Sequence, residues 1–408
     1  MKRVVVTGMS GLTSIGQDWS CIEKRLREKH NGIRHMPEWD RYETLNTRLA
    51  GPIDNFITPS HYTRKQTRSM GRVALLATRA TELAMINAGL LDDPEIKTGA
   101  MGIAYGSSSG STAPVKVFAN MLETGSMKGM TATTYIEMMS HTAPVNIALY
   151  FGLKGRIITT STACTSGSQG VGYAYETIKY GRLPMMVAGG AEELCPTQAG
   201  VFDSLFATST KNDTPYLTPR PFDQDRDGLV IGEGAGSLIL EDLEHAKARG
   251  ATIYAEIIGF GCNSDGNHIT QPDVQTMSGA MELALEDANL PPSAIGYVNA
   301  HGTATHRGDL AESKATHNVF SSTIPISSLK SYLGHTLGAC GALESWMSIE
   351  MMNNDWYAPT INLDNIDPDC EDLDYIIGNG RDINNEFVMS NNFAFGGINT
   401  SLIFKRWK

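Results

Sequence analysis

The sequence predicts an α/β fold made of two related halves, each with a mostly parallel sheet. Strand and helix signals alternate along the chain, as is typical of parallel sheets covered by helices. The same alternation begins again near residues 249–251. Glycine is abundant, with 41 residues gathered in short loops, and this favours tight turns between the elements. We therefore expect two units, residues 1–250 and 251–408.

In the first half, apolar and β-branched runs predict four strands. Helical spacing predicts helices around Trp19–Lys29, Val73–Leu90 and after residue 166. The strand Arg156–Thr162 is expected to be buried on both faces, because it is a continuous β-branched run. The other predicted strands of this half are Arg3–Thr7, Met101–Tyr105 and Met185–Ala191.

The second half repeats this pattern. We predict a helix over Thr276–Asn289 between its first two strands. The predicted strands are Tyr254–Gly261, Ile295–Ala300, Phe387–Met389 and Thr400–Phe404.

Composition excludes several classes of function. Across 408 residues, 44 acidic side chains outnumber 33 basic ones, for a net charge of −11, which argues against general nucleic-acid binding. No segment approaches the ~18 uninterrupted apolar residues of a membrane span, and the N-terminal valine run is too short and glycine-broken for a signal peptide. The six cysteines show no paired spacing, which predicts a reducing, cytoplasmic location.

Cys164 is the candidate nucleophile. It follows a predicted strand and precedes a helix, among the small residues Thr162–Ser168. A helix N-terminus favours negative charge, so we expect a lowered thiol pKa. The alternative is a buried structural cysteine packed among small side chains.

Three segments of the second half do not resemble core sequence. Asn299–Asp309 carries His301, Ser328–Gly338 carries Lys330 and His335, and Asn391–Asn399 is a glycine hairpin with two phenylalanines. Two histidines at strand ends and a candidate nucleophilic cysteine predict a catalytic cluster. Zinc is the competing use of one cysteine and two histidines, but no paired ligand spacing and no fourth ligand are evident.

Two charged segments can be interpreted in more than one way. Arg64, Lys65, Arg68 and Arg72 fall near one face of a predicted helix, which is either a solvated surface or a docking site for an acidic partner. Pro221–Gly236 begins like a calcium loop, but its required terminal glutamate falls on Gly234, so we reject calcium.

Four motifs together resemble the signature of the β-ketoacyl-ACP synthases of the Cys-His-His elongating type. They are TACTSG (162–167), NAHGTATHRGD (299–309), LKSYLGHTLGACGALE (329–344) and NNFAFGGIN (391–399). Segments 220–236 and 359–370 resemble further family segments, in the family's order over essentially the whole chain. The resemblance implies a duplicated thiolase-like fold, a five-layer αβαβα sandwich, acting as a dimer. It also implies a free-standing synthase, without a carrier or acyltransferase segment.

The implied reaction is condensation of malonyl-ACP with an acyl chain held on Cys164. His301 and His335 would stabilise the malonyl enolate, and Lys330 with Glu344 would form an ion pair that orders the site. Which histidine assists decarboxylation is left open. The backbone N–H groups of Cys164 and Phe395 would form the oxyanion hole, with Phe395 also gating the acyl pocket.

The remaining implied residues bind substrate or partner. Thr303 and Thr305 would hold the phosphopantetheine arm, which arrives on the acyl carrier protein, so no metal or separate cofactor is expected. The implied carrier-docking residues are Arg64, Lys65 and Arg68, and the implied acyl-binding residues are Phe202, Leu229, Ser108 and Phe393.

Three positions depart from the family pattern. Leu229 stands where Phe is usual, Ser108 where relatives carry Ile or Gly, and Cys340 where Ala is usual. The first two leave the acyl specificity open and admit a specialised polyene or aryl-polyene pathway. The dimer is then a homodimer or a heterodimer with a chain-length-factor-like paralogue.

Three rival functions remain. A thiolase would need a second cysteine in a CxG context, whereas the last cysteine here, Cys370, lies in DPDCED. A non-catalytic partner subunit would lack the nucleophile. A cysteine hydrolase would not need the lysine and two histidines.

Overall fold

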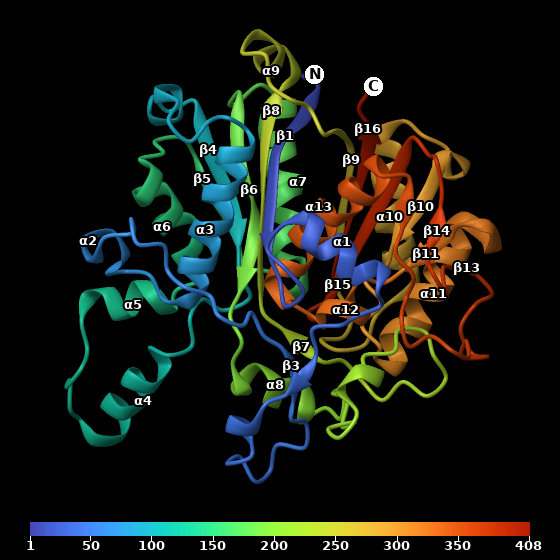
Figure 1. Cartoon of the computed structure of the whole chain (residues 1–408), viewed down its shortest axis with the longest axis horizontal. Coiled ribbons are helices and arrows are strands. Elements are labelled where there is room, and N and C mark those ends of the chain that lie inside the picture. The colour runs from blue at the N-terminus through green and yellow to red at the C-terminus, as the bar shows by residue number, and fades with distance from the viewer.

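The computed structural model describes all 408 residues. Two sheets with the same strand arrangement lie side by side, with helices between them and on both outer faces (Figure 1). The strands form one hydrogen-bonded sheet of 11. Its first-half part, called the first sheet below, has the order β5-β4-β6-β8-β1, and its second-half part, the second sheet, has the order β11-β10-β15-β16-β9. The corresponding strands occur in the same sequence order in both halves, so the expected duplication is confirmed. The first-half strands are β1 (Val4–Leu12), β4 (Met101–Gly106), β5 (Ile157–Thr160), β6 (Met185–Glu192) and β8 (Gly234–Asp242). The second-half strands are β9 (Ala255–Ser264), β10 (Ile295–Asn299), β11 (Pro325–Ser327), β15 (Phe387–Ala394) and β16 (Ile398–Arg406).

The sheets are mixed rather than mostly parallel. In the first half, β4 pairs in parallel with β5 and β6, while β8 is antiparallel to β6 and β1. The second half repeats this arrangement around β10 and β16. A short antiparallel ladder between β1 and β9 joins the halves, and β13 (Asp374–Tyr375) extends the second sheet. Short strands lie outside these sheets: β2 (Arg34–His35), β3 (Leu49–Gly51), β7 (Ile231–Gly232), β12 (Trp356–Tyr357) and β14 (Arg381–Asp382).

Helices α7 (Ser166–Lys179) and α13 (Cys340–Asn353) form the middle layer. Helix α13 packs against β8 of the first half and β15 of the second, and α7 against β6 and β16. The two helices cross closely at Gly167, where a Cβ atom would meet the Ala342 nitrogen at 2.9 Å. The outer layers are α3 (Arg72–Asn87) with α6 (Thr142–Phe151), and α10 (Val274–Ala288) with α11 (His306–Phe320). The five layers of the predicted sandwich are therefore all present.

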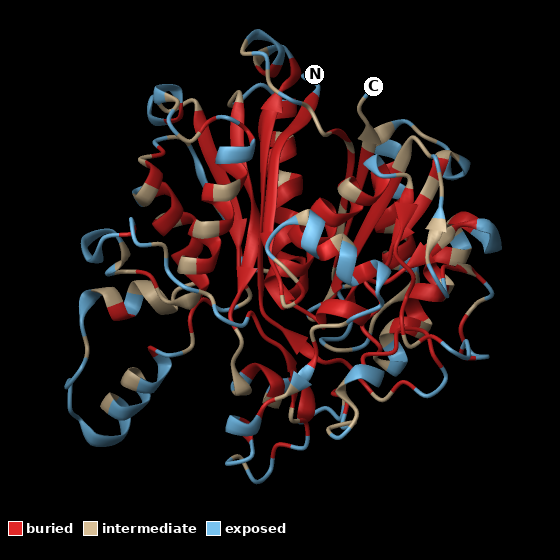
Figure 2. Ribbon diagram, viewed as in Figure 1, coloured by how far each residue is buried: buried red, intermediate tan, exposed pale blue.

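One hydrophobic core runs through both halves. Its largest cluster of 38 buried residues includes Val4 of β1, Tyr175 of α7, Trp346 of α13 and Phe404 of β16. Figure 2 shows this buried material in both sheets and in the helices between them. The inner face of each sheet is covered by the middle-layer helices α7 and α13. Because both sheets share these helices, the two halves stabilise each other.

Strand β5 corrects one expectation. It is the outermost strand of the first sheet and pairs only with β4. Ile157 is 44% exposed and Thr159 is also exposed. The run was expected to be buried on both faces, but β-branched composition alone does not distinguish a central strand from an edge strand.

An arm formed by α4 (Val115–Thr124) and α5 (Ala132–Met138) stands away from the sandwich (Figure 1). Helix α4 has no buried residue, and Leu122 is 85% exposed. Met127 and Tyr135 of the arm are exposed as well. The arm thus presents apolar side chains that no other part of the single chain covers. Among the helices, none combines the length and the apolar composition that a membrane crossing requires.

Candidate active site

Cys164 lies in a short 3₁₀ turn, Ala163–Thr165, between β5 and α7. Ala163 has a left-handed φ of 51°, a conformation that stores strain and is often found at functional sites. Hydroxyl groups brace the turn: Thr165 Oγ1 donates to the Thr162 carbonyl at 2.8 Å, and Ser166 Oγ to the Ala163 carbonyl at 2.7 Å. The small polar residues around Cys164 therefore hold the turn in place.

His335 lies directly against the thiol. Its Nε2 atom is 2.9 Å from Cys164 Sγ, and its Nδ1 atom accepts a hydrogen bond from the Leu337 N–H at 3.3 Å. Burial and then the Lys330 charge hold the His335 pKa well below its usual value, so the ring is neutral. Because Nδ1 is an acceptor, the single proton of the neutral ring resides on Nε2, and His335 donates toward the sulfur.

His301 completes the cluster from the second half. Its ring centroid is 5.1 Å from that of His335, with the planes at 87°. Burial, Lys330 and His335 lower its pKa well below the usual value. Both oxygens of Glu312 accept hydrogen bonds from this loop, from the backbone N–H of His301 at 2.7 Å and of Gly302 at 2.6 Å.

Lys330 and Glu344 form the predicted ion pair beneath the histidines, with Nζ and Oε1 2.5 Å apart. The second carboxylate oxygen accepts a hydrogen bond from Asn392 Nδ2 at 2.7 Å, and the same nitrogen lies 3.5 Å from His301 Nδ1. Asn392 therefore connects the ion pair to His301. Neither its role nor that of Glu312 was predicted, although Asn392 falls within the NNFAFGGIN segment.

The expected lowering of the Cys164 pKa is wrong. Burial raises the pKa of this thiol to about 11, against the opposing effects of the Lys330 charge and the backbone N–H groups of Phe395 and Cys164 itself. The loss of hydration outweighs the nearby donors because the sulfur is enclosed. The resting group is therefore the thiol, and attack requires its deprotonation.

A metal ion is the competing use of these three residues. The ligand atoms of Cys164, His301 and His335 all lie within 4.8 Å of one another. A tetrahedral zinc ion with its usual bond lengths would hold sulfur and nitrogen roughly 3.6 Å apart. The shorter 2.9 Å separation of Cys164 and His335 is a direct hydrogen-bond contact, so the geometry favours a nucleophile over a metal ligand set.

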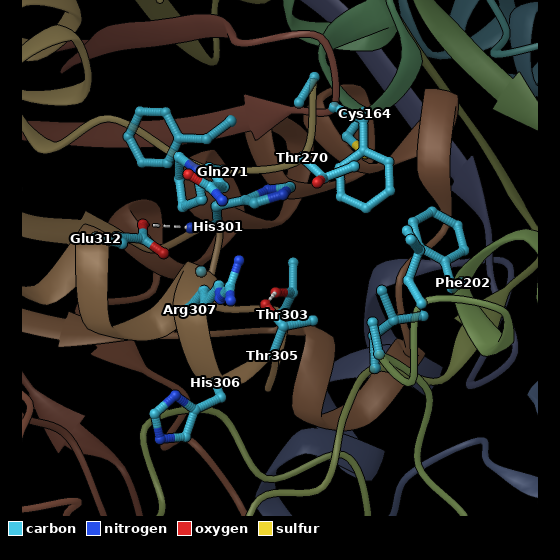
Figure 3. A pocket seen from close by; sticks show the side chains of 18 of the residues that line it. Cys164, Phe202, Thr270, Gln271, His301, Thr303, Thr305, His306, Arg307 and Glu312 are labelled. Atoms are coloured by element: carbon cyan, nitrogen blue, oxygen red, sulfur yellow. Dashed lines mark hydrogen bonds between the residues drawn. The ribbon is translucent and has the colours of Figure 1, made fainter. Parts of the chain in front are cut away.

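A cavity of about 550 Å³ opens at Cys164 (Figure 3). The Phe202 and Phe395 rings pack against each other in its wall at an angle of 48°, with centroids 5.0 Å apart, and Leu229 belongs to the same cluster. Phe393, Thr303 and Thr305 also line the cavity, and the two threonine hydroxyls are 2.9 Å apart. Every predicted substrate-contact residue except Ser108 is brought to this one space.

Ser108 does not line the cavity. Its backbone N–H donates to Glu192 Oε2 at 2.8 Å, and its carbonyl accepts from Ser161 Oγ at 3.2 Å. Glu192 also accepts from the Gly338 N–H at 3.0 Å, so this buried carboxylate joins the Ser108 loop to the His335 loop. The cavity at Cys164 therefore does not include Ser108, and the acyl-binding role implied for this residue stays a prediction.

The basic cluster is arranged differently from the prediction. Helix α2 covers only Arg64–Thr67, and Arg72 begins the separate helix α3. Arg72 forms an ion pair with Glu233 and is not part of the surface cluster. Arg64, Lys65 and Arg68 are exposed. The predicted single helix fails because its i, i+4 spacing crosses the break at Ser69–Gly71.

Comparison with known proteins decides the family. Models for the N-terminal and C-terminal domains of β-ketoacyl synthases match residues 1–246 and 254–364. The chain belongs to the β-ketoacyl synthase family. It is 37% identical to 3-oxoacyl-[acyl-carrier-protein] synthase 2 of Vibrio harveyi, over 99% of both chains. This ketosynthase is accordingly a condensing acyltransferase.

Solved structures agree with this family membership. A β-ketoacyl synthase from Burkholderia phymatum STM815 has a TM-score of 0.99 and 61% identity over the whole of both chains. The ishigamide ketosynthase/chain length factor gives 0.91 and 30%, again over both whole chains. AntDE:AntF, a type II polyketide acyl-carrier protein in complex with its ketosynthase, gives 0.88 and 31% over both whole chains. The thiolase-like fold of this ketosynthase is confirmed.

Proposed function

We propose that this ketosynthase elongates an acyl chain on Cys164 with malonyl-ACP, with the residues of the Cys164 cavity in defined roles. The observation that carries the assignment is the 2.9 Å contact between His335 Nε2 and Cys164 Sγ, with Nδ1 already used as an acceptor. This histidine is a fixed hydrogen-bond donor at the reacting sulfur. A hydrogen-bond donor stabilises a thiolate or an enolate oxygen. A general base accepts a proton instead and would not stabilise these anions.

The reaction runs in two transfers. Cys164 gives up its thiol proton, and the resulting thiolate attacks the acyl thioester. The carrier sulfur leaves as a thiolate that takes up this proton, and the backbone N–H groups of Cys164 and Phe395 stabilise the oxyanion formed in between. Malonyl-ACP then loses carbon dioxide, and His301 and His335 donate to the enolate oxygen. The enolate carbon attacks the Cys164 thioester, releasing the β-ketoacyl product and the thiolate. The phosphopantetheine arm is supplied by the carrier, so the protein needs no cofactor of its own.

A condensation assay tests this assignment. Purified protein with hexanoyl-ACP and malonyl-ACP is expected to give a Cys164 acyl adduct and then 3-oxooctanoyl-ACP by mass spectrometry. Cys164→Ala removes both products, whereas the matched surface variant Cys21→Ala leaves both unchanged. Adducts that persist in Cys164→Ala would reject the nucleophile, and wild-type protein without any adduct would reject the proposed reaction.

Arg64, Lys65 and Arg68 are proposed to dock the acidic carrier protein. All three side chains are exposed on a protein with a net charge of −11, so they offer a local positive surface. Replacing all three with Gln is expected to raise KM for malonyl-ACP about tenfold and weaken its salt dependence. Turnover of malonyl-pantetheine, which carries no protein, serves as the control and stays unchanged.

The active form is proposed to be a dimer formed through β5. Its outer edge is unpaired, and the apolar α4–α5 arm lies on the same half (Figure 1). An open strand edge pairs readily with a second strand. A second copy and a chain-length-factor-like paralogue are both compatible with this edge. We place the reaction in the cytoplasm, since all six cysteines are free thiols and Cys164 must be reduced to react.

A specialised polyene pathway is the second candidate function. Leu229 is buried in the cavity wall, where the family usually has the larger phenylalanine. The likeness to the ishigamide ketosynthase/chain length factor supports the chain-length-factor partner that such a pathway would use. Such a pathway predicts efficient acylation by conjugated donors. The intact Cys164, His301 and His335 cluster disfavours a non-catalytic subunit.

A further inference from the structure

Arg307 is the unpaired cation of the active-site cavity. The cavity wall holds two guanidinium groups, those of Arg226 and Arg307. Arg226 is buried and lies within ion-pair distance of Asp309, at 3.7 Å, and of Asp367, at 2.5 Å. Arg307 makes no ion pair and no side-chain hydrogen bond, and the acidic residues in the wall are engaged elsewhere.

None of these acidic residues contacts Arg307, and each is held by other groups. Asp265 accepts hydrogen bonds from Thr276 and Asn399. Glu312 is bonded to the backbone of His301 and Gly302. Asp227 accepts from the Thr210 N–H and lies 3.5 Å from Lys211.

The backbone that carries Arg307 is held in place. Arg226 Nη2 donates to the His306 carbonyl at 3.0 Å, and Asp309 Oδ1 accepts from the Ala304 N–H at 3.1 Å. These contacts set the start of α11 on both sides of Arg307. The Arg307 side chain therefore has no partner, whereas the backbone from which it extends is fixed beside the cavity.

The position of Arg307 lies on the substrate's path. In Figure 3 its side chain reaches into the cavity next to Thr303 and Thr305. Cys164 is buried at the inner end, whereas His306 and Arg307 are exposed at the mouth. A carrier-bound chain that reaches Cys164 must pass this guanidinium.

We propose that Arg307 recognises an anionic group of the carrier-bound substrate, an assignment that rests on the proposed function. Two groups present anionic oxygens to this cavity: the phosphodiester of the pantetheine arm and the carboxylate of the malonyl unit. A planar guanidinium can bind either through two parallel N–H donors. An unpaired arginine in a substrate channel is explained by a ligand that completes its hydrogen bonds.

Small thioester substrates can distinguish whether Arg307 binds the phosphate or the malonyl carboxylate. Hexanoyl and malonyl groups are each presented on pantetheine and on 4′-phosphopantetheine, and kcat/KM is measured for Cys164 acylation and for condensation with pre-acylated enzyme. If the phosphate is the ligand, Arg307→Gln lowers kcat/KM about tenfold for both phosphorylated donors and leaves the pantetheine donors unchanged. If the malonyl carboxylate is the ligand, Arg307→Gln lowers kcat/KM for both malonyl donors, with or without phosphate, and leaves both hexanoyl donors unchanged.

Two matched variants control for charge and geometry. Lys314→Gln removes a positive charge from the same helix, outside the cavity wall, and is expected to leave all four donors unaffected. Arg307→Lys keeps the charge without the planar fork and is expected to restore only part of the rate. Equal rates of Arg307→Gln and wild type on all four donors would overturn the proposal. Failure of the proposed function itself would differ, since wild-type protein would then form no Cys164 adduct from hexanoyl-ACP.

Discussion

The Lys330 ammonium and the Glu344 carboxylate face each other at 2.5 Å, with both side chains 1% exposed. Asn392 holds the far oxygen of Glu344, so the pair cannot rotate freely. The Lys330 charge lowers the pKa of Cys164, His301 and His335. One buried cation thus favours the thiolate form of the cysteine and the neutral form of both histidines, which is the combination that the condensation needs.

Lys330→Met is expected to slow Cys164 acylation and shift it to higher pH. In the wild type the thiol pKa is about 11, so the acylation rate rises with pH between 7 and 10. Without the ammonium the pKa rises further, and each unit lowers the thiolate population about tenfold. Iodoacetamide alkylation of Cys164 across this range gives the readout. The variant Lys330→Met/Glu344→Gln avoids an unpaired buried carboxylate, and an unshifted profile in this double variant would contradict the argument.

His301→Gln is expected to flatten the pH dependence of stability below pH 6.5. The folded protein keeps His301 neutral, because burial, Lys330 and His335 lower its pKa, whereas the unfolded chain protonates it near 6.5. The wild-type free energy of unfolding therefore falls with decreasing pH, by about 1.4 kcal/mol per unit more than in the variant. Urea denaturation at several pH values measures this slope. The exposed His30→Gln serves as the control, and parallel curves for His301→Gln and wild type would refute the assignment.

Leu229→Phe is expected to narrow the acyl specificity. Leu229 is 2% exposed in the cavity wall that also contains Phe202, so an added ring must occupy cavity space. We expect kcat/KM for conjugated or branched acyl donors to fall about tenfold relative to hexanoyl donors. Competition assays with mixed acyl-ACPs give the ratio directly. Val230→Leu, next in sequence but packed in a separate cluster with Ile33 and Leu49, should not change it.

Thr159→Pro is expected to weaken the dimer while leaving the subunit fold intact. The Arg156 carbonyl accepts from Ile103 of β4, and strand alternation then directs the backbone groups of 157 and 159 outward. Proline at 159 removes an N–H from the free edge without removing one from the β4 ladder. Sedimentation equilibrium is expected to show more monomer than in Thr159→Val. Equal dimer stability in both variants would exclude β5 as the interface.

Local patterns predict the fold class and the main residues of the site. Cys164 stands at a strand-to-helix turn, and His301 follows a strand, so short-range signals place both of them. The thiol pKa was predicted in the wrong direction because burial of Cys164 comes from distant segments, among them Phe202, Leu229 and Leu337. The edge position of β5 depends on strand order, which no single segment encodes.

The roles of Asn392 and Glu312 escaped prediction for a related reason. Each acts through a contact with a residue on another element or loop: Asn392 with Glu344 and Glu312 with the His301 backbone. A lone asparagine or glutamate carries no periodic or motif signal of such a contact. Side-chain networks between elements become visible only when the chain is folded.

The middle layer has a consequence for how this chain matures on the ribosome. Helix α7 is synthesised with the first half, but α13, which covers β8 from the same side, is made more than 150 residues later. The nascent first half therefore emerges with apolar surface uncovered and with its nucleophile lacking both histidines. Acylation competence is therefore acquired late in synthesis, since Phe395 is translated after Cys164 and both histidines.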